Sequence, residues 1–342
     1  MENAKLVSLV RGDNRKENIK KCLELIINDL DKLEKAKKIL IKPNLTALRP
    51  AFANTNIEAI EAVIEFIQTH FKNKEIFIGE SSATAFYNNL PTTKVFMDSG
   101  YYELEKKYSN VKLIDFDKDE EVIKVPIDSV VGDTYLRITK KVEDFDYKIS
   151  LTIPKTHNFA IATLGIKNMA GLVKQMDMAT IHGMKGGVEV DAPKTLLDYL
   201  PRGTVSKARR TLPNWLINFL FRQYPTYRKS VKIIHHNIVS FSKITFPDLV
   251  VLDGFVCMEG DGPIDGTPVD LRVAIASADP LKADGVGARL MGFEPEEIGY
   301  LYYLHEKGMG DYSLNGLIGD NLNSVKKVFI RHGTYDLQKD WQ

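Results

Sequence analysis

The chain has 342 residues, of which 44% are apolar and 27% charged, and 46 basic side chains nearly balance 45 acidic ones to leave a formal charge of +1. This composition excludes a disordered chain, and without a basic excess we expect no nucleic-acid partner. The two cysteines, Cys22 and Cys257, form no CxxC pair, so we expect neither a cysteine-ligated zinc site nor an intrinsic iron–sulfur cluster.

The beginning of the sequence and its apolar runs bear on location. A basic segment followed by an apolar one, as in a signal peptide, is not found after Met1. No apolar run approaches the roughly 20 residues that span a bilayer, so we expect no transmembrane segment. These features predict a cytoplasmic protein.

Strands and helices alternate in the first part of the chain. Apolar runs predict strands, and apolar residues at helical spacing predict helices. In chain order these elements are a strand at Leu6–Val10, a helix over 15–33, a strand at Lys38–Ile41, a helix from Ile57 to Phe71 and a strand at Ile76–Gly79. Strands separated by helices indicate parallel pairing.

The pattern then changes twice. Four strand-like runs with little helix between them predict a mixed or antiparallel extension of the sheet: Val111–Phe116, Val122–Ile127, Thr134–Thr139 and Tyr147–Ile153. Loops and helical runs near 205–223 and 228–240 follow. The last part returns to alternation, with strands at Leu249–Leu252 and Val273–Ala276, helices at Leu281–Met291 and Glu297–Lys307, and a final strand at Val325–Phe329.

We therefore predict an α/β protein with one mixed, largely parallel sheet flanked by helices. The chain, residues 1–342, is expected to form a single domain with a helical or loop insertion at about 176–245.

Polar residues follow the predicted second and third strands, where ligands of open α/β sheets bind. Lys42 and Asn44 flank Pro43 and could bind an anionic group, although a solvent-facing lysine in a turn is an alternative. Glu80 comes directly after Gly79 and is a candidate base or metal ligand, or a cap of the next turn.

The richest cluster follows the strand that ends near Ile153. It contains Lys155, His157, Lys167, Asn168 and His182, among small and apolar residues. A buried lysine changes its pKa readily, and histidine serves in acid–base catalysis or metal binding. We predict a catalytic cluster of the two lysines and two histidines, with Asn168 binding a cofactor.

A loop rich in glycine and carboxylates follows the strand at Leu249–Leu252. Asp253 and Glu259 are candidate metal ligands, and Gly260 and Gly262 would let a cofactor approach the backbone. The loop lacks the EF-hand pattern, and a turn with capping aspartates is the alternative. Asp279 before Pro280 predicts a helix N-cap.

One apolar run has basic neighbours on both sides. It includes Trp215 and Phe219 and lies between Arg209 and Arg228. Residues 210–229 could form a helix on a membrane surface, in the core, or in the interface of a homo-oligomer.

Five segments together resemble the family catalogued as domain of unknown function 362, from about residue 36 to 325. They are ILIKPNL, GES, IPKTHNFAIATLGIKNMAGL, VVLDGFVCMEGDGPIDGTPV and ASADPLKADGVGARLMGFEP. Many members of that family carry ferredoxin-type four-cysteine clusters. This chain lacks those cysteines, so the resemblance implies a separate ferredoxin-like protein as a redox partner.

The order of His157, Lys167 and His182 is also similar to the cofactor-binding stretch of nickel-pincer lactate racemases. That resemblance implies that Lys167 matches the lysine that tethers the nickel cofactor and that His182 matches the nickel ligand. His157 would match a further active-site histidine.

These patterns lead to two hypotheses. In the first, the protein is an enzyme with a site rich in lysine, histidine and carboxylates that binds a divalent metal or a small anionic cofactor or substrate. Its chemistry would be redox or racemase-like. In the second, it is a non-catalytic ligand-binding or scaffold protein that works with a separate redox partner.

Overall fold

The computed structural model describes residues 5–47, 51–130, 132–183 and 225–342, with a few positions between 212 and 219. A ten-stranded sheet forms its centre, and eight of the strands follow the order β12-β1-β11-β10-β7-β2-β3-β4. Their bounds are β1 Val7–Arg11, β2 Lys38–Lys42, β3 Glu75–Glu80, β4 Val111–Asp115, β7 Tyr147–Thr152, β10 Leu249–Glu259, β11 Thr267–Ser277 and β12 Leu317–Gly319. The predicted α/β class with a mixed, mostly parallel sheet flanked by helices is confirmed.

The sheet is mixed because of one hairpin. β10 and β11 pair antiparallel, and β11 also pairs antiparallel with β1. The other pairs along the sheet are parallel, from β10 through β7, β2 and β3 to β4, and between β1 and β12. The strands β7, β2 and β3 therefore end at the same edge.

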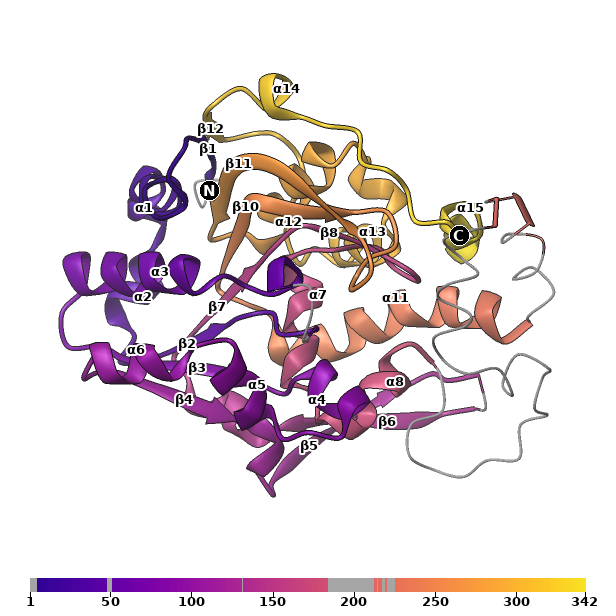
Figure 1. Cartoon of the computed structure of the whole chain (residues 1–342), viewed down its shortest axis with the longest axis horizontal. Helices are drawn as coiled ribbons and strands as arrows, with labels where there is room; N and C mark the ends of the chain where they lie inside the picture. The colour runs from indigo at the N-terminus through magenta and orange to yellow at the C-terminus, as the bar shows by residue number, and fades with distance from the viewer. Residues whose placement is uncertain are drawn as a thin grey trace.

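Helices cover both faces of the sheet (Figure 1). Side chains alternate along β2, where Ile39 and Ile41 pack with α1 (Arg15–Leu25) and α3 (Ile57–His70), and Leu40 packs on the opposite side. That opposite side carries α11 (Pro225–Thr245), α12 (Pro280–Leu290) and α13 (Gly299–Glu306). Burial on both faces explains why the strands are apolar runs rather than alternating ones.

The remaining helices are short. They are α2 Asp31–Lys35, α4 Ala83–Asn88, α5 Thr92–Asp98, α6 Tyr102–Lys107, α7 Gly165–Asn168, α8 Met178–Ile181, α14 Leu322–Val325 and α15 Tyr335–Gln338. The N-cap prediction for Asp279 is confirmed, since its side chain accepts hydrogen bonds from the amides of Leu281 and Lys282 at the start of α12.

The region from 111 to 153 differs from its prediction. β4 is the parallel edge strand next to β3, and β7 lies in the middle of the sheet rather than in an extension. β5 (Val122–Ile127) and β6 (Thr134–Thr139) form a separate two-stranded antiparallel sheet, and an isolated bridge joins Ile138 of β6 to Val173. Periodicity identified the strands, but it holds no information about which distant strand each one pairs with.

Three further predictions of helices and strands are wrong in part or concern residues that the structure does not describe. The predicted helix over 15–33 ends at Leu25, and a 3₁₀ turn at Ile27–Asp29 separates it from α2. The predicted strand at Val325–Phe329 is wrong, because α14 ends at Val325 and the last strand is β12. Most of the helical run near 205–223, and much of the proposed insertion, lies outside the described residues.

None of the helices in the described ranges is long and apolar enough to span a bilayer.

Candidate functional site

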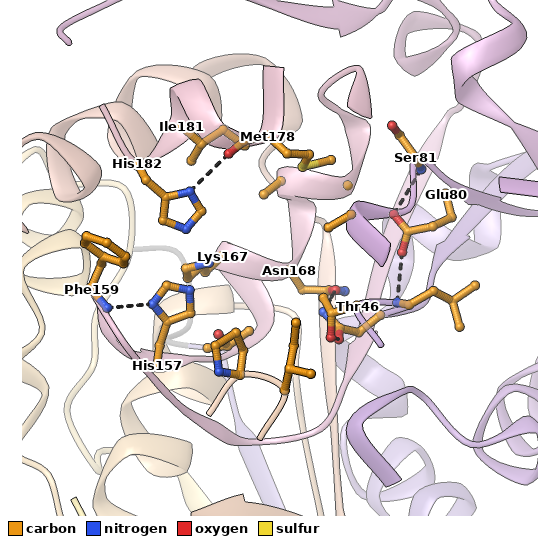
Figure 2. A pocket seen from close by; sticks show the side chains of 18 of the residues that line it. Thr46, Glu80, Ser81, His157, Phe159, Lys167, Asn168, Met178, Ile181 and His182 are labelled. Carbon is orange, nitrogen blue, oxygen red and sulfur yellow. Dashed lines mark hydrogen bonds between the residues drawn. The ribbon is translucent and has the colours of Figure 1, made fainter. Parts of the chain in front are cut away.

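A cavity of about 480 Å³ lies where β2, β3 and β7 end. Figure 2 shows Glu80 and Ser81 on one side of it and His157, Lys167 and His182 on the other. Its wall also includes Asn44, Thr46, Asn168, Phe159, Met178 and Ile181, and the β10–β11 turn at Pro263, Ile264 and Asp265. The position at the carboxyl ends of parallel strands is the one expected for ligands of an open α/β sheet.

A buried ion pair connects the ends of β2 and β3. The Lys42 ammonium lies 2.6 Å from Glu80 Oε2 and donates to the carbonyl of Pro43 at 2.5 Å. The other carboxylate oxygen of Glu80 accepts from the amide of Ser81 at 3.0 Å, and Leu45 donates its amide to Oε2 at 3.2 Å. Burial lowers the pKa of Lys42 and raises the pKa of Glu80 to about 7, while the pairing opposes both changes.

The backbone at Gly171 closes over this ion pair. A Cβ atom built there would lie 1.9 Å from Glu80 Oε1 and 2.4 Å from the Lys42 ammonium. The Gly171 carbonyl accepts from the amide of Ser81 at 2.8 Å. Only glycine allows this approach, so the residue is part of the wall that keeps the pair dry.

Lys155 lies behind the cavity wall with every contact made to a neutral oxygen. Its ammonium donates to Asn44 Oδ1 at 2.7 Å, Thr46 Oγ1 at 2.8 Å and the carbonyl of Ala53 at 2.9 Å. Burial and the nearby Lys167 lower the pKa of Lys155 to about 7. Its contacts make it a support for Asn44 and Thr46.

Asn44 continues this support to the next helix. Its amide donates to Asn168 Oδ1 at 2.9 Å, and Asn168 donates to the carbonyl of Lys42 and to Ser150 Oγ, both at 3.0 Å. Ser150 in turn donates to the carbonyl of Gly165 at 2.7 Å. We call Lys42, Glu80, Asn44, Lys155 and Asn168 the paired end of the cavity, since protein groups satisfy their charged and polar atoms.

The short helix α7 carries Lys167 into the cavity and is fixed by a carboxylate. Asp284, fully buried on α12, accepts the amides of Gly165 at 2.7 Å and Ile166 at 2.9 Å. Burial raises the pKa of Asp284 to about 7 against the effect of these two bonds. Asp284 therefore caps the first turn of α7.

Lys167 differs from the other buried lysines of the site. Only 8% of it is exposed, and among the described residues no hydrogen bond or ion pair engages its ammonium. Burial lowers the pKa of Lys167 to about 8. Burying a cation without a partner costs free energy, and an anionic ligand that pairs with Lys167 would offset this cost.

His157 is held as a hydrogen-bond donor toward the cavity. Its Nδ1 accepts the backbone amides of Phe159 at 3.0 Å and Ala160 at 3.1 Å. A neutral ring that accepts at Nδ1 carries its proton on Nε2. Burial and the nearby Lys167 and His182 hold the pKa of His157 well below its usual range, so the ring is neutral.

His182 is held in the opposite tautomer. Its Nδ1 lies 3.0 Å from the carbonyl of Met178, which can only accept, so Nδ1 carries the proton and Nε2 keeps its lone pair. The rings of His157 and His182 are nearly parallel, with centroids 5.5 Å apart, and both Nε2 atoms point toward the space beside Lys167 (Figure 2). Burial and Lys167 lower the pKa of His182 to about 3.

Thr163 is a further polar residue of the cavity wall. Its hydroxyl is buried and has no hydrogen-bond partner among the described residues. We call His157, Lys167, His182 and Thr163 the unpaired end. A buried polar atom without a partner is costly, and a ligand oxygen would satisfy it.

The structure does not bring the other predicted residues into the cavity. Asp253 pairs with Arg15 at 3.1 Å, and Glu259 pairs with Lys327 at 3.4 Å and accepts the amide of Ile330. Gly260 and Gly262 pack on Thr156 of strand β8 (Lys155–His157) instead of facing the cavity. The three predicted metal ligands Glu80, Asp253 and Glu259 therefore belong to separate networks.

The described residues hold no group of three or more histidine, cysteine or acidic side chains with the geometry of a metal site. Within the part of the chain that the structure describes, His182 Nε2 and the neighbouring Lys167 amine nevertheless have no hydrogen-bond partner. A cofactor tethered to Lys167 with a metal bound by His182 fits these two side chains. His157 does not fit as a second ligand, because its Nε2 carries the proton.

Comparison with known proteins agrees with the motifs. The family described as domain of unknown function (DUF362) matches residues 39–289. The chain belongs to this family. Among curated proteins, this DUF362 chain is similar to a thylakoid-associated protein of Synechocystis sp., with 25% identity over 263 residues. The match covers 76% of the chain and 65% of that relative, so the chain spans about 65% of the relative's length.

Among solved structures, the DUF362 chain is similar to the lactate racemase apoprotein from Thermoanaerobacterium thermosaccharolyticum. The TM-score is 0.43 and the identity 14%, over 74% of this chain and 51% of that one.

The sequence analysis missed Thr163 and Gly171, which line the cavity, and Ser150, which accepts a hydrogen bond from Asn168. Thr163 and Ser150 lie in apolar runs, and a polar residue inside a buried strand was the available signal. Gly171 gave no signal beyond being a glycine. Of the predicted apolar surface, Trp215 and Phe219 are 70% and 56% exposed, but most of residues 210–224 lie outside the described ranges.

Proposed function

We propose that this DUF362 protein is an enzyme that binds a small carboxylate-bearing molecule in the cavity and performs acid–base chemistry at a carbon next to its carboxylate or carbonyl group. The observation that carries the proposal is the unpaired end: a buried ammonium without a counter-ion among the described residues, beside two imidazoles held in opposite tautomers. A cation, a fixed donor and a fixed acceptor form a set that binds an anion and moves a proton.

Each group has a distinct role in this proposal. Lys167 pairs with the carboxylate of the substrate, and Thr163 donates its hydroxyl to a second oxygen. His182 Nε2 takes a proton from the carbon next to the carboxylate of a 2-hydroxy acid, or from the carbon next to the carbonyl of a 2-oxo acid. The electron pair of that C–H bond moves onto the carboxylate or carbonyl oxygen. His157 Nε2–H and Lys167 stabilise the negative charge there, and the imidazolium of His182 returns the proton.

The electrostatics make this base dependent on the ligand. The charge of Lys167 contributes to the low pKa of His182. A bound carboxylate offsets that charge, so the pKa of His182 rises and the ring becomes a stronger base when substrate is present. His157 stays neutral and acts as an electrophilic donor rather than as an acid, as a neutral imidazole does when it polarises an oxygen.

The size of the cavity indicates more than a three-carbon acid. About 480 Å³ is within the range of pockets that bury a drug-sized ligand, and Phe159, Met178 and Ile181 give it apolar walls. A 2-oxo or 2-hydroxy acid with an apolar or aromatic side chain fits this lining, as does a smaller acid together with a cofactor.

Deuterium exchange tests the proposal directly. The protein would be incubated in D₂O with phenylpyruvate, phenyllactate or mandelate, and loss of the proton signal next to the carbonyl or carboxylate would be followed by NMR against a protein-free blank. His182→Gln should lower the protein-dependent exchange by roughly 100- to 10,000-fold, the range for a general base. Lys167→Met should abolish binding, and Lys94→Met, at an exposed ion pair, should change neither.

Binding without exchange would instead support the second hypothesis, a ligand-binding protein without catalysis. If His182→Gln binds the ligand and catalyses deuterium exchange at the wild-type rate, the role given to His182 is overturned. The expected redox partner, oligomeric assembly and cytoplasmic location stay predictions. The curated relative bears a name that associates it with thylakoids, so a membrane-surface location of this chain is a further hypothesis, which flotation with anionic liposomes would test.

A further inference from the structure

The segment from Lys327 to Gln338, which we call the strap, touches two walls of the cavity from outside the family match. The match ends at residue 289. In Figure 1 the strap is the yellow chain that runs from α14 to α15, past the ends of β8 and β10. It is anchored on the end of α12, where Phe329 donates its amide to the carbonyl of Met291 at 3.0 Å.

The strap first holds the turn between β10 and β11, whose residues Pro263–Asp265 line the cavity. Gly260 donates its amide to the carbonyl of Ile330 at 2.8 Å, and Ile330 donates its amide to Glu259 Oε2 at 3.0 Å. Lys327 pairs with the same carboxylate at 3.4 Å. Glu259, predicted as a metal ligand, thus ties this turn to the strap.

At its other end the strap holds the β8–β9 hairpin, which carries His157 before its turn. β9 is Ile161–Thr163, and its first residue has a φ of +65°. A β-branched side chain in the left-handed region is a strained arrangement that surrounding contacts must enforce. Gln338 supplies such a contact, because its fully buried Oε1 accepts the amide of Ile161 at 2.7 Å.

Thr334 holds the side chain of Gln338, and Tyr227 holds the turn between β8 and β9. Gln338 Nε2 donates to Thr334 Oγ1 at 3.1 Å, and Tyr227 donates its hydroxyl to the carbonyl of Asn158 in the turn at 2.6 Å. Between Asn158 and Ile161 lie the two residues, Phe159 and Ala160, whose amides donate to His157 Nδ1. The turn that Gln338 constrains is therefore the turn that sets the tautomer of His157.

We infer that Gln338 is a positioning residue of the site: by holding the strained hairpin, it keeps Phe159 and Ala160 on His157 Nδ1 and so keeps the donor proton on Nε2. The inference deepens the proposed function, since it concerns the donor that faces the ligand. Without Gln338 the Ile161 backbone relaxes toward negative φ, the two amides leave Nδ1, and the ring exchanges between tautomers.

The tautomer can be observed without any substrate. The protein labelled with ¹⁵N-histidine would be measured by long-range ¹H–¹⁵N NMR, with the His157 signals assigned from their loss in His157→Asn. Wild type and the exposed control Gln342→Leu should show one tautomer with the proton on Nε2. Gln338→Leu should lose that pattern and show an exchange average, while His182 keeps its own pattern.

A conservative variant separates positioning from general stability. Gln338→Glu, measured at pH 5 to favour its carboxylic acid form, has the same shape, accepts from Ile161 and donates to Thr334, so it should restore the wild-type pattern. Should Gln338→Leu not fold, Thr334→Val removes the hydroxyl that holds Nε2 of Gln338 and should show a partial change. The inference is overturned if folded Gln338→Leu shows the wild-type signals of His157. If only Thr334→Val folds, wild-type signals in that variant overturn it. Neither outcome depends on the result of deuterium exchange.

Discussion

The two ends of the cavity contain the same kinds of residues in opposite states. At the paired end, Lys42 lies 2.6 Å from Glu80, and Lys155 donates to three oxygens. At the unpaired end, Lys167 has no partner among the described residues, and each imidazole uses only Nδ1 in a hydrogen bond with the protein. Both ends are buried, so the difference lies in pairing and not in exposure.

This difference separates framework from chemistry. A buried charge with a full set of partners stabilises the fold. Removing one partner leaves the remaining charge buried without compensation, which is strongly destabilising. A buried charge without partners weakens the fold and persists where binding requires it. We therefore propose that Lys42, Glu80 and Lys155 belong to the framework. The ligand binding, metal binding and catalysis that the sequence suggested for them stay predictions.

The same substitution at the two ends should have opposite effects on stability, and the larger effect is expected at the paired end. Lys42→Met leaves the Glu80 carboxylate buried without its cation, so the free energy of unfolding should fall by about 3–5 kcal/mol. Urea unfolding at pH 7 would measure the change. The double variant with Glu80→Gln, in which no charge is left, should recover part of the loss. A Lys42→Met protein as stable as wild type would mean that the pair is not closed to water.

Lys167→Met should instead raise the free energy of unfolding, by roughly 1–3 kcal/mol at pH 7, because it removes a desolvated and unpaired ammonium. The gain should depend on pH. The folded pKa of Lys167, about 8, lies below its unfolded value of 10.5. Between these values the unfolded chain keeps the proton and the folded chain has lost it, so wild-type stability rises with pH.

The difference between Lys167→Met and wild type should accordingly be largest below pH 8 and shrink toward pH 10.5. Unfolding curves of both proteins across this range would measure it, and the subtraction removes the titration of groups that they share. A difference that stays constant with pH would show that Lys167 is not titrating in this window. A loss of stability in Lys167→Met would show that its ammonium has a partner and belongs to the framework.

Much of the fold could be predicted from the sequence, because apolar runs buried on both faces and amphipathic helices have clear patterns. The predicted strands at Leu249–Leu252 and Val273–Ala276 cover only the beginning of β10 and the last part of β11, which extend over Leu249–Glu259 and Thr267–Ser277 as one long hairpin. Polar residues such as Asp253 and Asp270 interrupt the apolar runs there, so the run length underestimates the strand.

The site was predicted as a set of residues but not as two groups. The sequence places Lys155, His157, Lys167 and His182 near one strand end, and the structure brings the last three to one side of the cavity. Whether a lysine is paired depends on residues far along the chain: the partner of Lys42 is 38 residues away, and Lys155 reaches Asn44 across 111. The tautomers depend on backbone groups, which no side-chain pattern reveals.

Chemical reactivity gives a last and smaller distinction between the lysines. Cyanate carbamylates neutral amines, and near pH 8 about half of Lys167 is neutral, against a small fraction of a surface lysine with an ordinary pKa. Lys167 should therefore be carbamylated faster than the exposed Lys94 and Lys106, measured by peptide mass spectrometry at short times. Lys42 and Lys155 should be protected, although burial lowers the pKa of both, because their nitrogens donate to surrounding acceptor oxygens. Phenyllactate, if it pairs with Lys167, should slow the reaction there and leave Lys94 unchanged.

Equal labelling of Lys155 and Lys167 would show that pairing does not distinguish the reactivity of the two ends. The assignment of chemistry to the unpaired end would then lose its basis.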